Sequence, residues 1–228
     1  MSIDDTVVKW LNEFSSRECL INLAVSYISS AAIFKGGVSV ALLWGAWARG
    51  GRVTAQPVLI WRLMLGTVAA LVASRLIQNT FPARARPMMD PALAMSPPYG
   101  FNADSFSEWS SFPSDNATLF AALATATFIM HRKIGIASFM HTIFVISLPR
   151  LYLGLHYPSD ILSGAAIGIA MVILTSRINF PEKVTSAVEK TALKYPSWHM
   201  FCLYLLTFGC ATMFDDIRAL TVELWERL

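Results

Sequence analysis

An arginine, a histidine and an aspartate stand close together between two apolar stretches of the sequence. Arg150 precedes His156 by six positions, and Asp160 follows His156 by four. Pro158 is favourable in the first turn of a helix, so Asp160 is expected in that turn, within reach of the histidine. A carboxylate on one imidazole nitrogen leaves the other nucleophilic, and an arginine beside it suits phosphate. The segment predicts a phosphate-reactive site, with a loop and a capping aspartate as the alternative.

Two further clusters contain residue types that bind anions. Segment 82–87 holds Arg84 and Arg86, and segment 111–116 opens an apolar stretch with a proline and Ser114. The first turn of a helix has unpaired backbone N–H groups, and the helix dipole favours negative charge there. The second cluster therefore predicts an anion site, in which Ser114 can also act as an ordinary N-cap.

The composition indicates an integral membrane protein. The 228 residues are 55% hydrophobic and 14% charged, with a mean hydropathy of +0.51, whereas soluble domains carry about 25% charged residues. The net charge of +3 is small and no basic stripe alternates with aromatic residues, so nucleic acid is not an expected partner. The cysteines show no metal-ligand spacing, and Cys202 and Cys210 are expected to pack as small hydrophobic side chains. No metal or cofactor is expected.

The hydropathy pattern predicts an all-α membrane bundle in a single domain, 1–228, with about six transmembrane helices. The expected spans are residues 34–48, 57–78, 114–130, 134–148, 159–176 and 200–214. Residues 1–33 are expected to form an N-terminal segment whose first part, 1–18, is an amphipathic interfacial helix. The part at 19–33 is apolar but short, and either packs on the bundle or re-enters it. Residues 177–228 hold the last span and the tail.

The distribution of charge predicts an orientation. Basic residues collect on one side, against only Glu182 and Glu189, at Arg49, Arg52, Arg132, Lys133, Arg177, Lys183, Lys190 and Lys194. The positive-inside rule places this side in the cytoplasm. The long loop at 79–112 and the segment 150–160 then share the opposite face, which is periplasmic in a bacterial inner membrane, together with both termini.

These motifs resemble those of the type 2 phosphatidic acid phosphatase (PAP2) superfamily of membrane lipid phosphatases. That family carries Lys-x6-Arg-Pro, then Pro-Ser-Gly-His, then Ser-Arg-x5-His-x3-Asp. The third motif here reads Pro149-Arg150, five residues, His156, three residues and Asp160, within the run LYLGLHYPSDILSGAAIG that is typical of bacterial members. The resemblance covers residues 34–176, which form the PAP2-like core.

The resemblance implies a role for each matching position. His156 attacks phosphorus and becomes a phosphohistidine, with Asp160 orienting it. Arg86 and Arg150 hold the phosphoryl oxygens and stabilise the transition-state charge. The start of the third span completes the phosphate cradle through Ser114, Asp115 and nearby backbone N–H groups.

The first motif lacks its lysine, because Asn79 stands seven residues before Arg86. Arg75, one helical turn earlier, and Arg84, in the loop, are each a possible source of the missing charge. A surface or interfacial role for each of these two arginines is the alternative.

The second motif lacks its histidine, because Asn116 occupies the position whose histidine would protonate the leaving oxygen. Asparagine forms hydrogen bonds but is no general acid near neutral pH. Asp115 is a weak substitute, because an ordinary aspartate is ionised at pH 7. A lipid diphosphate releases a better leaving group than a monophosphate, so the diphosphate is expected to tolerate Asn116 better.

The resemblance favours hydrolysis of a polyprenyl (for example undecaprenyl) phosphate or diphosphate, or a related lipid phosphate, at the non-cytoplasmic surface of the bilayer. Two alternatives stay open: a catalytically silent lipid-phosphate binder or carrier, and a phosphotransferase that uses a lipid diphosphate. Vanadate-dependent haloperoxidases have a similar arrangement of motifs, but they are soluble proteins, whereas this sequence predicts a membrane protein.

The remaining polar residues carry weaker expectations. His141 is expected to form a helix–helix hydrogen bond, while His131 lies on the wrong face for catalysis and His199 near an interface. The pair Gly164 and Gly168 predicts close helix packing. Three loop residues are candidates for shaping the substrate mouth, with solvated loop positions as the default: Asp104, Glu108 and Trp109.

Overall fold

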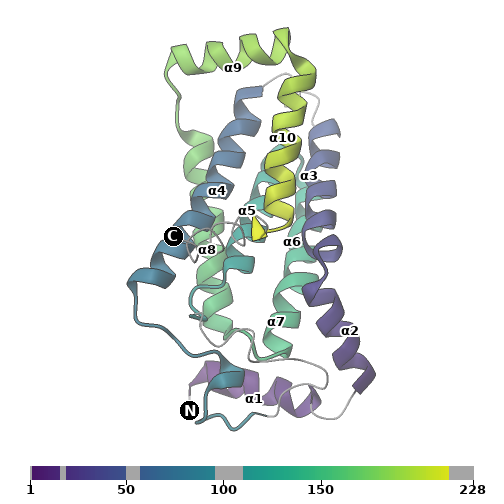
Figure 1. The fold of residues 1–228 in the computed structure, drawn as a ribbon, viewed down its shortest axis with the longest axis vertical. Coiled ribbons are helices and arrows are strands. Elements are labelled where there is room, and N and C mark those ends of the chain that lie inside the picture. Colours follow the sequence, from purple (N-terminus) through teal and green to yellow (C-terminus); the bar gives the residue numbers. More distant parts are fainter. Residues whose placement is uncertain (1, 16–18, 50–56, 96–109, 216–228) are drawn as a thin grey trace, which may run out of the picture.

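The computed structural model describes residues 2–15, 19–49, 57–95 and 110–215. Within these ranges the chain is helical and has no strand, so the predicted all-α class is confirmed. Figure 1 shows an upright helix bundle that is crossed at one end by the N-terminal helix α1 and at the other by α9. Loop residues 104, 108 and 109, assigned above to the substrate mouth, lie outside the described residues.

The N-terminal helices cover one end and one side of the bundle, with α1 across the end and α2 to α3 along the side. In chain order they are α1 (Ile3–Ser15), α2 (Cys19–Ser30), the π-helical η1 (Ile33–Gly37) and α3 (Val38–Arg49). The helices on either side of residues 31–32 bend by 63°. The expected span at 34–48 is therefore one arm of a bent pair, in which the apolar segment at 19–33 forms the other arm.

The middle of the chain supplies the centre of the bundle. Its elements are α4 (Pro57–Thr80), the short 3-10 helix η2 (Pro87–Met89), α5 (Asp115–Met130), α6 (Arg132–His141), the π-helical η4 (Thr142–Ser147), α7 (Leu148–Tyr152) and α8 (Pro158–Arg177). Most of α5 is buried, because α3, α4, α6 and α8 all pack against it. Gly164 and Gly168 bring α8 against the backbone of α5, where an added Cβ would collide with main-chain oxygens. This confirms the packing role expected of the two glycines.

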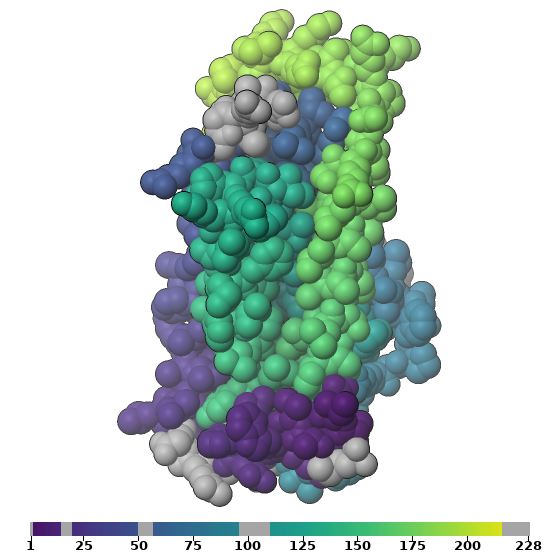
Figure 2. Space-filling model, turned by 180° about the vertical axis from the view of Figure 1, so that it is seen from behind, coloured from purple at the N-terminus to yellow at the C-terminus, as the bar shows by residue number. Residues whose placement is uncertain are grey.

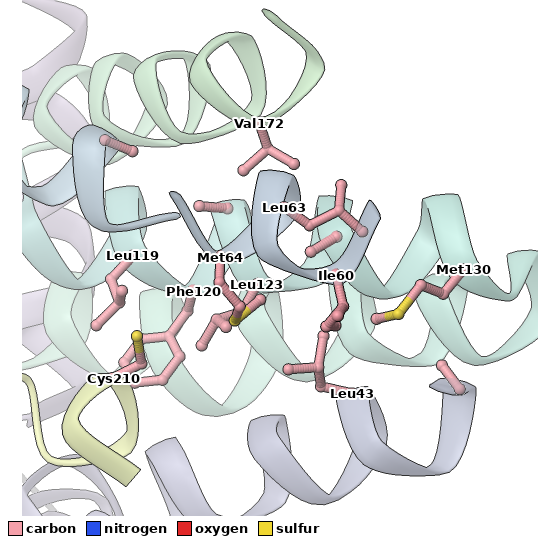
Figure 3. Close-up of a cluster of buried hydrophobic side chains, with 14 of the residues drawn as sticks. Leu43, Ile60, Leu63, Met64, Leu119, Phe120, Leu123, Met130, Val172 and Cys210 are labelled. Atoms are coloured by element: carbon pink, nitrogen blue, oxygen red, sulfur yellow. The ribbon is translucent and has the colours of Figure 1, made fainter. Parts of the chain in front are cut away.

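The hydrophobic core follows α5 along the axis of the bundle. Figure 3 shows Phe120 and Leu123 of α5 packed beside Met64 of α4, with Leu43 and Cys210 approaching from α3 and α10. All five are buried and belong to one apolar cluster. Cys210 therefore packs as a small hydrophobic side chain, as expected, and Cys202 is partly buried with a free thiol.

The last two helices are α9 (Glu182–Lys194) and α10 (Pro196–Ala211). The basic stretch from residue 177 onward was expected to precede the last span, and most of it forms the exposed helix α9. In Figure 1 α9 lies across the end of the bundle opposite α1, and α10 returns along α3.

The described residues contain three helices long and apolar enough to cross a membrane: Pro57–Thr80, Arg132–Tyr152 and Pro158–Arg177. The bent pair of N-terminal helices raises this number to four, and α5 is a shorter apolar helix. All six expected apolar segments are helical, but six full spans are not confirmed. The fourth expected span, 134–148, is in fact longer and includes Arg150, which the sequence placed in the break.

Candidate active site

Three segments that are not part of the long helices meet at the α1 end of the bundle. They are the chain after α4, the chain before α5 and the turn between α7 and α8. Backbone hydrogen bonds join them, from Ser111 N to the Arg84 carbonyl (2.9 Å) and from Met88 N to the Gly154 carbonyl (3.0 Å), and Ser114 N bonds to the Asp160 carbonyl in the first turn of α8 (3.1 Å). Residues from all three sequence motifs therefore lie in one place.

His156 is buried in the turn between α7 and α8, and its Nδ1 lies 2.9 Å from the carbonyl oxygen of Ser111. A carbonyl can only accept a hydrogen bond, so Nδ1 carries the proton and Nε2 keeps its lone pair. The Asp160 carboxylate was expected to bond to this imidazole, but its Oδ2 is 3.8 Å from Nδ1. The backbone carbonyl of Ser111, at the start of the second cluster, is the hydrogen-bond acceptor of the ring, and the Asp160 carboxylate lies beside it.

The electrostatic surroundings keep His156 neutral. Burial lowers the pKa of His156 to about 4, and the positive charges of Arg86 and Arg150 act in the same direction, while Asp160 opposes them. A neutral imidazole with a free Nε2 is the nucleophilic form. The same two arginines are the groups predicted to hold a phosphoryl group.

Asp160 is completely buried, in the first turn of α8 as expected. Its Oδ2 accepts a hydrogen bond from the backbone N–H of Tyr157 (2.8 Å), and its Oδ1 accepts one from Nη1 of Arg84 (2.6 Å). The Arg84 guanidinium also stacks 3.9 Å from the centre of the Tyr157 ring. Arg84 thus binds the carboxylate beside His156, which differs from the expected surface position or phosphate contact.

Arg86 and Arg150 are both buried, although one lies in the segment after α4 and the other in α7. Arg86 donates from Nη1 to the Leu155 carbonyl (3.1 Å), in the residue before His156. Within the described part of the chain, Nε of Arg150 is buried and has no hydrogen-bond partner. Burying a cation is costly unless it is paired, so this place favours an anion.

Asp115 lies at the start of α5 and faces α4. Its carboxylate accepts hydrogen bonds from Ser74 (2.8 Å) and Gln78 (2.7 Å) and pairs with Arg75 at 2.7 Å. Three donors to one carboxylate stabilise its ionised form, which argues against Asp115 as a proton donor. Arg75, the other candidate for the missing lysine charge, is engaged with Asp115. Asn79 is exposed near the end of α4.

Ser114 caps α5, accepting a hydrogen bond from Ala117 N at 3.4 Å, so its N-cap role is confirmed. Asn116 lies in the first turn of the same helix and is buried. Its side-chain oxygen has no hydrogen-bond partner among the described residues. A buried amide without a partner at a helix start is available to a ligand.

The other histidines have structural surroundings. His141 joins two helices through Nε2 to the Phe34 carbonyl (2.8 Å) and Nδ1 to Ser39 Oγ (3.3 Å), as expected. His131 caps α6, and Nδ1 of His199 accepts from the Trp61 indole at 3.4 Å. The described residues contain no group of three or more His, Cys, Asp or Glu that could hold a metal ion.

Sequence comparisons extend the likeness beyond the motifs. The model of the PAP2 superfamily matches residues 59–183. "Putative undecaprenyl-diphosphatase YbjG" of Escherichia coli (strain K12) is 28% identical over 163 residues, 72% of each chain. "Bacitracin transport permease protein BcrC" of Bacillus licheniformis is 30% identical over 84 residues, 35% of this chain and 41% of BcrC. No solved structure matches significantly. Because the family model covers more than half of the chain, the protein belongs to the PAP2 superfamily.

Proposed function

We propose that the protein is a membrane lipid phosphatase that works through a phosphohistidine at His156. The observation that carries this proposal is a buried, neutral imidazole next to two buried arginines. Two cations favour a phosphate group, and a neutral imidazole with a free Nε2 can attack it. Family membership supports phosphatase chemistry in general, and the substrate and the steps below belong to the proposal.

The reaction has two displacements at phosphorus. In the first, the Nε2 lone pair of His156 forms the P–N bond, and the bond to the lipid oxygen breaks with its electron pair on that oxygen. In the second, water attacks phosphorus and loses a proton to the bulk solvent, the P–N bond breaks with its electron pair on Nε2, and inorganic phosphate leaves. Arg86 and Arg150 stabilise the charge on the phosphoryl oxygens in both steps. The Ser111 carbonyl keeps the proton on Nδ1 throughout.

Asn116 favours a diphosphate substrate. It can donate a hydrogen bond to the leaving oxygen from its amide, but it cannot deliver a proton. A monophosphate expels an alkoxide and needs that proton, whereas a lipid diphosphate expels a phosphate monoester. We therefore infer hydrolysis of a polyprenyl diphosphate, in keeping with the printed name of the relative YbjG.

The proposed site opens at the periplasmic surface of a bacterial inner membrane. The cluster of basic residues on the opposite side supports this orientation. Apolar side chains exposed along α4 and α8, among them Val72, Leu76 and Leu162, offer a surface to lipid tails.

A silent lipid-phosphate binder or carrier is the second candidate, and the amide at position 116 favours it. A binder needs the two arginines but no oriented nucleophile. Phosphotransfer from a lipid diphosphate to another acceptor uses the same phosphohistidine and differs only in the second step. Adding acceptors and looking for a phosphorylated product separates transfer from hydrolysis.

One experiment tests the proposal. The purified protein is incubated with a polyprenyl diphosphate labelled in its terminal phosphate, quenched in alkali and examined for label on histidine. We expect label at His156 and release of phosphate. The label should be absent from His156→Gln and retained in His131→Gln, which changes a histidine that caps α6. Binding of the lipid without label in the wild type would support the silent binder instead.

A further inference from the structure

An aspartate from the N-terminal helix reaches the network around the nucleophile. Asp4 lies in the first turn of α1, and its Oδ2 accepts from Nη2 of Arg84 at 2.9 Å. Asp4 also accepts from the backbone N–H of Ser159 at 3.1 Å and forms a short hydrogen bond with the Ser159 hydroxyl. The opposite end of the Arg84 fork donates from Nη1 to Asp160. Arg84 thus bridges two carboxylates that are far apart in the sequence.

The position of α1 is set by packing as well as by charge. Val8, one turn after Asp4, is completely buried against Leu93 and Tyr157. Tyr157 also stacks under Arg84, so the same ring supports both α1 and the arginine. Figure 2 shows α1 lying across the end of the bundle, over the helices that lead into the site.

The charge of Asp4 matches its surroundings. Burial tends to raise the pKa of Asp4, but hydrogen bonds from Ser159 and Arg84 outweigh it and lower the pKa. Asp4 is therefore a carboxylate at neutral pH. An arginine held at both ends of its planar fork loses most of its rotational freedom, so the carboxylate it binds is also fixed.

We propose that Asp4 is a positioning residue for the reaction: by holding Arg84, it fixes the Asp160 carboxylate beside His156. The inference rests on the proposed function, since it assigns Asp4 to the same site. Asp4 does not touch the phosphoryl group and acts through Arg84. Helix α1 is thus part of the active site as well as a surface helix. The competing explanation for the contacts of Asp4 is that it only caps the start of α8 through Ser159.

The first test compares Asp4→Asn with Asp5→Asn. Asp5 lies in the same helical turn and is partly exposed, and its hydrogen bonds among the described residues are with Ser2 in its own turn, so it controls for charge loss in α1. Coupling within one network commonly changes a rate by about twofold to a hundredfold. We expect Asp4→Asn to lower kcat by about tenfold with KM within about twofold, and Asp5→Asn to change neither. Equal effects of the two variants would overturn the proposal.

A double-mutant cycle tests the route through Arg84. In an Arg84→Gln background, Asp4→Asn should lower kcat by less than about twofold, because the bridge is already broken. Ser159→Ala removes a hydroxyl that bonds to Asp4 and also accepts from Nη1 of Arg84 at 2.8 Å. It leaves the Arg84 bridge between the two carboxylates and should cost much less than Asp4→Asn. Additive losses from Asp4 and Arg84, or a loss in Ser159→Ala that equals that in Asp4→Asn and persists in the Arg84→Gln background, would assign Asp4 to capping instead.

Binding of two inorganic probes separates this inference from the proposed function. Orthovanadate accepts the Nε2 lone pair and becomes five-coordinate, so its affinity depends on the orientation of His156, whereas inorganic phosphate binds through the arginines. We expect Asp4→Asn to weaken vanadate binding about tenfold and phosphate binding less than about twofold. If the wild type releases no phosphate from a lipid monophosphate or a lipid diphosphate, the proposed function fails. The comparison of vanadate with phosphate binding still decides the inference about Asp4. A variant that loses both probes and its thermal stability together would show a structural role only.

Discussion

Two arginine–carboxylate pairs border the proposed active site, and they are built differently. Asp115 is the first residue of α5, and its carboxylate bonds to three neighbouring side chains of α4: Ser74, Arg75 and Gln78. Asp160 opens α8 and takes its side-chain partner, Arg84, from an irregular segment. Each pair therefore joins the first turn of a helix to a preceding part of the chain.

The difference lies in what else each carboxylate can reach. Asp160 stands 3.8 Å from the imidazole and contributes to the pKa of His156. Asp115 has its donors on the far side, in α4, and is not among the groups that shift that pKa. The same chemical pair joins α4 to α5 in one case and lies beside His156, the proposed nucleophile, in the other.

Removing the charge of Asp160 should mainly lower activity, whereas removing the charge of Asp115 should mainly lower stability. Asp160→Asn should lower kcat on the order of 10²–10⁴-fold, up to the loss caused by the comparable change in a serine protease triad. Asp115→Asn should instead lower the free energy of unfolding by about 1–3 kcal/mol, because Arg75 loses its counter-charge while partly exposed. Steady-state kinetics and thermal unfolding in detergent measure the two. Loss of activity without loss of stability in Asp115→Asn would contradict the contrast.

The residue next to Asp115 offers a gain of function. Asn116→His should raise turnover of a lipid monophosphate by about tenfold or more, the lower part of the range for general acid catalysis. The imidazolium must be protonated, so an alkaline limb should appear in the pH profile. Turnover of a diphosphate should change less. Asn116→Gln keeps the amide and serves as the control; a rise there would show that the added proton is not the cause.

The two arginines of these pairs should also differ. Arg84→Gln should lower kcat about tenfold, because Asp160 loses the side-chain hydrogen bond that Arg84 donates to it. Arg75→Gln should lower kcat less than about threefold. If Arg75→Gln raises KM strongly while Arg84→Gln does not, Arg75 supplies the charge of the missing motif lysine after all.

The smallest expected effect is on the acid limb of kcat/KM. Protonation removes the Nε2 lone pair, so activity should fall as the pH drops through the His156 pKa of about 4. Asp160 raises that pKa, so Asp160→Asn should move the limb down by about one unit. Asp115→Asn should leave it in place. An acid limb near the ordinary histidine value of about 6.5 would contradict a buried nucleophile.

Much of this organisation could be predicted from the sequence. Apolar runs located all six helical segments, and Ser114 and Pro158 marked two helix starts, because such signals act within a few residues. The span count was less predictable, since the bend between α2 and η1 depends on what the helices pack against. The same holds for the end of the fourth predicted span, which continues past Leu148 to include Arg150 in α7.

The sequence by itself determined the helices, the membrane character and the residue types of a phosphate site. Only the tertiary structure decided the partners: Arg84 with Asp160 and Asp4, Arg75 with Asp115, and the Ser111 carbonyl with His156. A carbonyl is present at every residue and carries no sequence signal. Charges such as those of Asp4 and Asp160 meet only when helices that are distant in the sequence pack together. Their pairing is set by that packing, which no local pattern records.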